Sequence, residues 1–397
     1  MDRREFLKGS FLTSMALTIP GLAHADIKFP LKSAYDHKEL LSLIEKSKKK
    51  YSSLTMTGVD PAVNFIYERN GDVGATRPGV VFFNDDQEQA IIDVPIFAHS
   101  IEQNPNHPNR IMLIPKRISK CVEFDIIENK VVSEISLDQK KFYGHGCYIP
   151  GTDLFYASTY LYGSSDASML IFDHKKNKIV KEIEIPGGAG SHQCTLSLDK
   201  KYIIITFSEP TKGHTPSLAW FDIKTNELVD RVYGLDAHSE HFLELNDGNI
   251  VYTGGRVTNE KQLPPVVFGC VTKEKKVNNF SVANMPKPTD FVGQGIAIVA
   301  LEHKKMFVVT NLTTSLIYFY NYETGALIKT MPIRKPRGIS LSNDGKKMYV
   351  TSLSFKPVKV GAEVTVIDVE TTNIIGTFMV KNSLAFSSHI SQFLLNS

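Results

Sequence analysis

The sequence predicts an all-β fold, a seven-bladed β-propeller with four-stranded blades, and three observations support this prediction. A run of β-branched and aromatic residues that ends at a turn residue occurs seven times. The runs recur with a period of about 48 residues, which is typical of a four-stranded blade. Between them, Asp-Gly or Asp-Lys turns flanked by alternating apolar residues indicate a second, inner hairpin. A β-sandwich would show strands spaced by 8 to 12 residues without the longer period.

The seven runs define the outer half of each blade, and they end in Asp or Asn except for one that ends in Cys270. They occupy residues 79–84, 119–125, 168–173, 217–222, 265–270, 316–321 and 363–368. The inner hairpins are clearest at residues 144–158, 191–206 and 337–351. The first run opens in mid-blade and the chain ends with an inner strand near 388–395, so we expect both ends to share the closing blade, which leaves no long free edge. Residues 61–78 fit no repeat position and are expected to form a loop insertion.

The N-terminal segment predicts export. Arg3 and Arg4 precede Phe-Leu-Lys, an apolar stretch at 11–22 follows, and Ala23-His24-Ala25 forms a small-residue cleavage site. These features indicate a twin-arginine signal peptide over residues 1–25 and a periplasmic protein. We expect residues 26–50 to form an extension with one short amphipathic helix, and residues 51–397 to form the propeller. The twin-arginine route transports folded proteins, often ones that receive a cofactor inside the cell.

Composition excludes several classes of function. The 45 Lys and Arg residues nearly balance the 42 Asp and Glu residues, and the basic residues cluster only at 46–50, so no nucleic-acid partner is expected. No apolar run approaches the roughly 18 residues of a membrane span, so no transmembrane segment is expected after signal cleavage. The four cysteines form no Cys-x-x-Cys motif, which argues against haem attachment and a zinc ribbon. The single Trp argues against folds whose blades repeat a tryptophan.

Histidine recurs at one phase of the repeat. The first residue of each inner strand faces the axis of a propeller, and five of the seven such positions are histidine. These positions are His99, His145, His192, His241, Gln294, Arg337 and His389. Because the ring relates the strands, side chains at this phase converge on the axis. Convergent neutral imidazoles suit copper, zinc or iron, and a carboxylate such as Glu240 could orient them. The alternative is that the histidines cap the inner strands around a water-filled channel.

The remaining candidates are expected to be structural. Cys147 and Cys194 follow two of the histidines at positions where other blades hold Ile or Leu, so we interpret them as small fillers of the core. We expect the other histidines examined to lie in solvated loops, and they are His107, His174, His214 and His238. No nucleophile elbow, phosphate-binding loop or His-Glu-x-x-His motif is present, so no motif supports an enzymatic activity. Asp236 and Glu240 near the channel are the candidate general bases.

Four segments resemble an uncharacterised family of twin-arginine-exported propellers, a domain of unknown function. The segments are Arg-Arg-x-Phe-Leu at 3–7, Phe-Tyr-Gly-His-Gly at 142–146, Gly-Ser-His-Gln with Leu-Ser-Leu-Asp at 190–199 and Thr-Pro-Ser-Leu at 215–218. Family members have Arg-x-Gly-His-Gly, Phe-Tyr-Gly-His-Gly, Gly-Pro-His-Glu and Arg-His-Leu in successive blades, and they are often encoded beside imelysin-like iron-uptake proteins and di-haem peroxidase-like proteins. The resemblance is clearest between residues 96 and 256, and it implies that the family histidines correspond to His99, His145, His192 and His241.

Two departures limit this correspondence. Gln193 stands where the family has Glu after the histidine, and Glu240-His241-Phe242 stands where it has Arg-His-Leu. The histidines therefore transfer from the family, whereas a carboxylate ligand does not. The hairpin at 336–345 is also similar to those of propeller lactonases and YVTN-repeat surface proteins.

The leading hypothesis is a periplasmic propeller that binds iron or copper through His145, His192 and His241, assisted by His99 and His389. It would serve metal acquisition or handling, with another exported iron- or copper-handling protein as its partner. Two alternatives stay open: a metal-free scaffold that docks another exported protein, and a lactonase-like hydrolase with a divalent ion.

Overall fold

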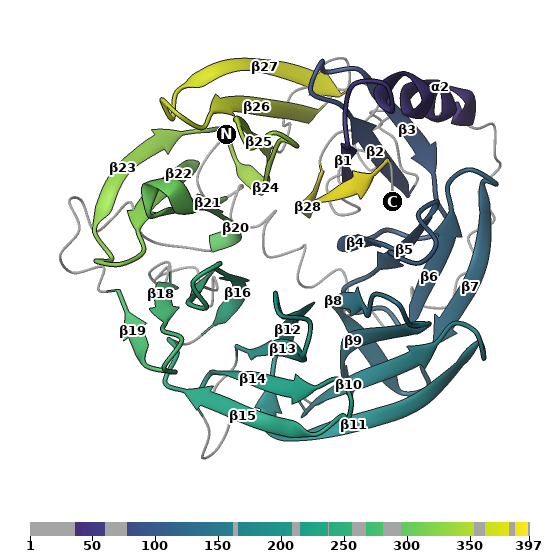
Figure 1. Cartoon of the computed structure of the whole chain (residues 1–397), viewed down its shortest axis with the longest axis vertical. Helices are drawn as coiled ribbons and strands as arrows, with labels where there is room; N and C mark the ends of the chain where they lie inside the picture. The colour runs from purple at the N-terminus through teal and green to yellow at the C-terminus, as the bar shows by residue number, and fades with distance from the viewer. Residues whose placement is uncertain are drawn as a thin grey trace, which may run out of the picture.

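Seven antiparallel sheets of four strands surround a central axis, as Figure 1 shows. The computed structural model describes residues 36–59, 78–161, 166–208, 215–236, 238–255, 267–280, 295–352, 362–380 and 386–395. The predicted seven-bladed propeller is therefore confirmed. The expected signal peptide, residues 61–77 of the expected loop insertion, His214 and Gln294 lie outside the described residues.

We number the blades in chain order and give their strands from the axis outward. Blade 1 contains β28 (Phe386–Leu394), β1 (Ser53–Val59), β2 (Gly79–Phe83) and β3 (Gln89–Asp93). Blade 2 contains β4 (Ser100–Gln103), β5 (Arg110–Ile114), β6 (Lys120–Asp125) and β7 (Lys130–Ser136). Blade 3 contains β8 (Lys140–Tyr148), β9 (Leu154–Leu161), β10 (Asp166–Asp173) and β11 (Lys178–Ala189).

The other four blades follow the same order without interruption. Blade 4 contains β12 (Ser191–Leu196), β13 (Tyr202–Phe207), β14 (Ser217–Asp222) and β15 (Leu228–Tyr233). Blade 5 contains β16 (Ser239–Glu244), β17 (Ile250–Gly254), β18 (Val267–Val271) and β19 (Val277–Asn279). Blade 6 contains β20 (Gly295–Leu301), the short 3-10 helix η4 (Glu302–Lys304), β21 (Met306–Asn311), β22 (Leu316–Asn321) and β23 (Leu327–Pro332). Blade 7 contains β24 (Pro336–Leu341), β25 (Lys347–Ser352), β26 (Ala362–Asp368) and β27 (Ile374–Val380).

The repeated run of the sequence is the third strand of every blade, and its turn residue shapes the outer hairpin. The carboxylate of Asp222, at the end of β14, accepts hydrogen bonds from the backbone N–H groups of Lys224 and Thr225 at 2.8 and 2.9 Å. Asn321 makes the equivalent pair of bonds at the end of β22. Asp and Asn are favoured there because their short side chains can bond to the backbone two and three residues ahead.

The first blade joins both ends of the chain. β28 pairs with β1 in an antiparallel register that runs from Ser53 opposite Leu394 to Thr57 opposite Ile390. In Figure 1 the yellow β28 lies beside the dark β1. The prediction that the C-terminal strand closes the ring is therefore confirmed, although the sequence analysis did not identify β1 as a strand.

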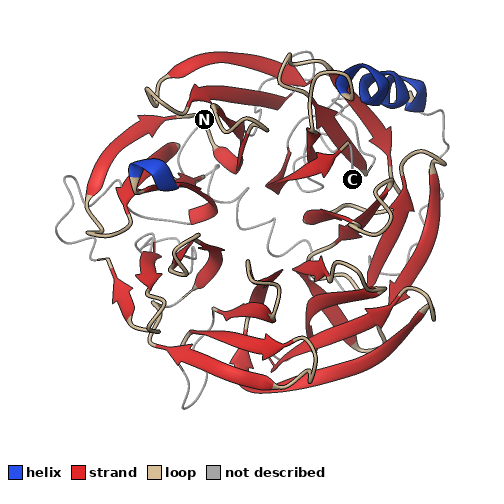
Figure 2. Cartoon of the chain, viewed as in Figure 1, coloured by secondary structure: helices blue, strands red, loops and turns tan. Residues whose placement is uncertain are grey.

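The only α-helix among the described residues covers the outside of the first blade. Helix α2 (His37–Ser47) begins at Asp36, whose side chain caps the backbone N–H of Lys38 at 2.9 Å. Its blue ribbon lies at the rim of the ring in Figure 2. Within the described ranges, no helix is both long enough and apolar enough to cross a membrane.

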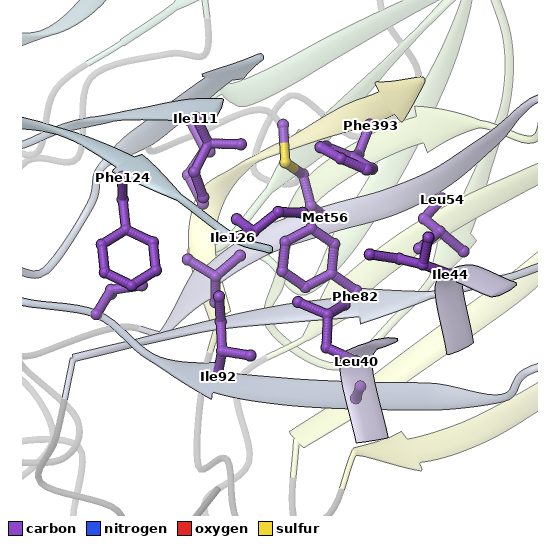
Figure 3. Packing of buried hydrophobic residues seen from close by; sticks show 14 of the residues in the cluster. Leu40, Ile44, Leu54, Met56, Phe82, Ile92, Ile111, Phe124, Ile126 and Phe393 are labelled. Carbon is purple, nitrogen blue, oxygen red and sulfur yellow. The ribbon is translucent and has the colours of Figure 1, made fainter. Parts of the chain in front are cut away.

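A hydrophobic cluster fills the space between blades 1 and 2. Figure 3 shows Leu40 and Ile44 of the helix near Leu54 of β1, with Phe82 and Phe393 close by. The rings of Phe82 and Phe393 meet edge-on, with centroids 5.7 Å apart. Comparable clusters lie between the other blades, so each blade face is buried against its neighbour.

Candidate metal centre

Five histidines from five different blades lie together at the axis. His99 directly precedes β4, and the others lie in β8, β12, β16 and β28, which are inner strands around the centre of Figure 1. The closest pairs of ring centroids are 4.4 Å apart for His145–His389, 4.7 Å for His99–His389, 4.7 Å for His192–His241 and 4.8 Å for His145–His192. The Nε2 atoms of His99 and His389 are 3.2 Å apart. The predicted convergence of these imidazoles is therefore a feature of the fold.

Irregularities in the inner strands bring the histidines to the axis. The pairing register shifts between Phe142 and Gly146 in β8, between Ser191 and Cys194 in β12, and between Ser239 and His241 in β16. Such bulges bend a strand and redirect its side chains. At Gly144, where φ is +111°, an added Cβ would collide with the ring of His99, so this close approach requires glycine.

Hydroxyl groups on the second strands hold the histidine backbones. The hydroxyl of Ser158 lies 3.2 and 3.0 Å from the carbonyl oxygens of His145 and His192. Thr57 donates to the carbonyl of His389 at 2.9 Å. Ser and Thr thus link the inner strand of one blade to its own second strand or to the next blade. This role was not predicted from the sequence, although Ser158 ends one of the predicted inner hairpins.

Burial keeps the imidazoles neutral. The relative exposures of His145, His192 and His241 are 7, 0 and 4%. Desolvation lowers the pKa of these three imidazoles and of His99 well below the usual range, and the charge of Lys116 lowers it further. Burial, with Lys116 and Arg337, lowers the pKa of His389 to about 3. All five rings are therefore unprotonated at neutral pH, which is the form that binds a metal ion.

Several of these ring nitrogens lack hydrogen-bond partners. Within the described residues, Nε2 of His145 and both ring nitrogens of His192 are buried and make no hydrogen bond. Ligand atoms of His99, His145, His192 and His389 lie within 4.8 Å of one another, as do those of His192, Glu240 and His241. Buried polar atoms normally have partners. A metal ion that binds imidazole nitrogens would supply the partner that these atoms lack.

A small cavity borders the cluster. It has a volume of about 170 Å³ and is lined by His145, His241 and His389, together with Glu102 and other residues of the inner strands. Burial raises the pKa of the Glu102 carboxyl to about 8, so this group is largely protonated at neutral pH. The cavity provides space for water or a small ligand beside the imidazoles.

Comparison with models of protein families identifies the family of this chain. The model of the family described as Protein of unknown function (DUF1513) matches residues 92–390, which is more than half of the chain. The chain belongs to this family. The family resemblance identified from the histidine motifs is thus confirmed at the level of family and fold. A search of curated proteins finds no match.

Solved structures share the propeller fold of this family member. Hydrazine synthase of Kuenenia stuttgartiensis is 12% identical with a TM-score of 0.55, and the match covers 76% of this chain and 89% of that one. A functionally unknown protein from Desulfotomaculum acetoxidans is 13% identical with a TM-score of 0.54, and the match covers 86% of this chain and 99% of that one. At these identities the similarity concerns the fold alone.

The departures from the family motifs have a structural explanation. The Gln193 side chain donates to the carbonyl of Phe242 and accepts from its N–H, both at 2.8 Å, and so ties β12 to β16. A carboxylate at this position could only accept. Glu240 is 7% exposed, and its Oε2 lies 4.0 Å from Nε2 of His241. The carboxylate beside the cluster therefore comes from blade 5.

One histidine assigned to a solvated loop is buried. The His174 side chain is 7% exposed, and its Nδ1 lies 3.2 Å from Oε2 of Glu123 in the neighbouring blade. Asn104 and Tyr148 donate to the other carboxylate oxygen at 2.7 and 2.9 Å. Burial raises the pKa of Glu123, but the hydrogen bond and charge interaction with His174, together with the bonds from Asn104 and Tyr148, outweigh it and lower the pKa to about 2. The expectation of a solvated His174 was wrong because contacts between blades are not encoded in the pattern of a single blade.

Cys147 and Cys194 occupy the core as expected. Their relative exposures are 7 and 2%, and both belong to the hydrophobic cluster between blades 3 and 4. The neighbouring Cys194 thiol and burial raise the pKa of the Cys147 thiol well above its usual range. A thiol with a raised pKa is a poor metal ligand at neutral pH, which supports a packing role.

Proposed function

We propose that the protein binds a transition metal ion, iron or copper, through its axial histidines and serves metal acquisition or handling in the periplasm. The observation that most supports the proposal is the set of buried imidazole nitrogens without hydrogen-bond partners at His145 and His192. Such atoms are costly in a protein core unless a ligand satisfies them.

The chemistry of the donors narrows the kind of ion. Neutral imidazole is a donor of intermediate softness that binds copper, iron, nickel and zinc, whereas Mg²⁺ and Ca²⁺ prefer oxygen. Burial keeps the rings unprotonated, and the positive charge of Lys116 adds to this effect without occupying a ligand position. The cavity beside His145 and His241 would give a bound ion contact with water or with a small ligand.

The arrangement of the ligands also fits a role in handling. The candidate ligands lie in or beside the inner strands of five blades, so an ion would be held by several blades at once. We propose that a second exported iron- or copper-handling protein delivers or receives the ion. The support for this partner is the family resemblance in the histidine motifs.

Elemental analysis of the natively exported protein tests metal binding. We expect a stoichiometric transition metal in the wild type and its loss, by at least tenfold, in the double variant H145A/H192A, because two of the four mutually close imidazoles are removed. The control is H107A/H303A, which changes exposed histidines and should retain the metal. Wild-type protein that binds no iron, copper or zinc, even after reloading, would contradict the proposal and favour the metal-free scaffold.

A further inference from the structure

His192 belongs to two groups of candidate metal ligands. One group contains His99, His145, His192 and His389, and the other contains His192, Glu240 and His241. Within each group the ligand atoms lie within 4.8 Å of one another. Among the described residues, His192 is the only one common to both groups. A single ion that used the first group would leave Glu240 and His241 outside its set of ligands.

A single ion would also leave one of the two ring nitrogens of His192 without a partner. Both are buried and make no hydrogen bond within the described residues. A neutral imidazole has an N–H group on one nitrogen and a lone pair on the other. One ion would satisfy only one nitrogen and leave the other as a buried polar atom without a partner. The wall of the small cavity includes His145, His241 and His389 and does not include His192.

Hydrogen bonds hold the second group beside the first. Glu240 and His241 are adjacent in β16, and their side chains are 9 and 5% exposed. The hydroxyl of Thr206 donates to the carbonyl of Glu240 at 3.0 Å and accepts from the N–H of Gln193 at 3.0 Å. This hydroxyl therefore fixes β16 beside the residue that follows His192. The ring centroids of His192 and His241 are 4.7 Å apart.

We infer that the centre holds two metal ions bridged by the imidazole of His192. The inference rests on the proposed function and extends it. When the second ion binds, the N–H proton of His192 is released to solvent, and the resulting imidazolate has one lone pair for each ion. Glu240 supplies a negative charge to the second ion, which the all-histidine group lacks. The ligands of both ions suit divalent copper, zinc or iron.

Copper stoichiometry tests the bridge. The exported protein is stripped with a chelator, loaded with Cu²⁺, freed of excess copper and analysed for copper per chain. We expect two copper ions in the wild type and one in E240Q, because the amide removes the charged ligand of the second ion. The matched control E274Q changes an exposed carboxylate and should bind two.

Electron paramagnetic resonance gives a readout that depends on the bridge itself. Two Cu²⁺ ions joined by an imidazolate are antiferromagnetically coupled, so the integrated signal of the wild type at low temperature should be well below that of two coppers. E240Q should show the full signal of one isolated copper. Even if E240Q does not fold, the stoichiometry and signal of the wild type decide the question.

The outcomes separate the two proposals. One copper per chain in the wild type, or two coppers with a full uncoupled signal, would overturn the bridge and leave the proposed metal site intact. No bound copper, iron or zinc would overturn the proposed metal function itself.

Discussion

Three histidines of the cluster are held through their backbone carbonyls. The carbonyls of His145, His192 and His389 accept from the hydroxyls of Ser158 and Thr57 on neighbouring strands. These bonds set where each side chain leaves the strand, and burial then removes the water that would otherwise solvate the rings. Backbone restraint and desolvation together produce neutral imidazoles whose nitrogens face one another.

The lowered pKa values predict that acid destabilises the metal-free protein between pH 6.5 and 5.5. In this range the unfolded chain protonates its histidines near 6.5, whereas the folded chain keeps the five imidazoles neutral, with the pKa of His389 at about 3. The unfolded state therefore binds more protons, and stability falls as pH decreases, by about 1 kcal/mol per histidine per pH unit.

Two carboxyl groups with shifted pKa values, Glu102 and Glu123, change this balance little. Glu102 acts in the opposite direction, because its folded pKa of about 8 makes the unfolded chain ionise first as pH rises. One such carboxyl is outweighed by five imidazoles. Glu123 is ionised in both states over this range, since its pKa of about 2 lies far below it. Urea unfolding in the presence of a chelator checks the prediction, and stability that stays level or rises on acidification would refute it.

At the level of elements, the closing strand β28 contributes to both the fold and the site. It completes blade 1 by pairing with β1, and it brings His389 to the axis from the end of the chain. Its outer end is anchored by Phe393, which is 3% exposed and packs against Phe82. Packing far from the axis therefore helps to position a candidate ligand.

The variant F393A should destabilise the protein by about 3–5 kcal/mol, because the substitution leaves a cavity in a packed cluster. The adjacent variant L394A alters a side chain that is 49% exposed and should change the free energy of unfolding by less than about 0.5 kcal/mol. Denaturant unfolding of both variants measures the difference. Equal losses in the two variants would mean that strand pairing, rather than this aromatic contact, anchors β28.

The sequence was sufficient for elements whose signal repeats. All seven third strands coincide with the predicted runs, because each run is rich in β-forming residues and six of the seven end in an Asp or Asn that can bond to its own turn. β1 was missed because both of its partners in the blade are far from it along the chain. Its partner β2 begins at Gly79, and its other partner is the C-terminal strand. A hairpin pattern cannot reveal a strand that has no hairpin on either side.

For the whole molecule, the sequence likewise predicts only those features of the site that recur with the repeat. The phase of the repeat predicted which histidines converge, since the ring places equivalent positions around one axis. Glu102, Lys116 and the buried pair of Glu123 and His174 depend on contacts between blades, which have no period in the sequence. The family match shows the family of the chain. The chemistry of the site is inferred from its residues.

Ring closure also bears on the predicted export by the twin-arginine route. β1 can complete its sheet only after the last residues of the chain have been synthesised, because β28 lies between it and the axis. The histidine cluster likewise needs residues 99 and 389 together. A centre assembled from both ends of the chain forms only in the folded protein, and the twin-arginine route transports proteins in that state.

We predict how the N-terminal segment, expected to be a signal peptide, behaves in cells. Native protein from the periplasm should begin at Asp26, after cleavage behind Ala25, as measured by intact mass and N-terminal sequencing. The variant R3K/R4K should remain in the cytoplasm at full length, because the paired arginines are the features that the export machinery recognises. The control K48R/K49R leaves the motif intact and should be exported. Export of R3K/R4K at the wild-type level would show that the chain leaves the cytoplasm by another route, one that does not require the propeller to close first.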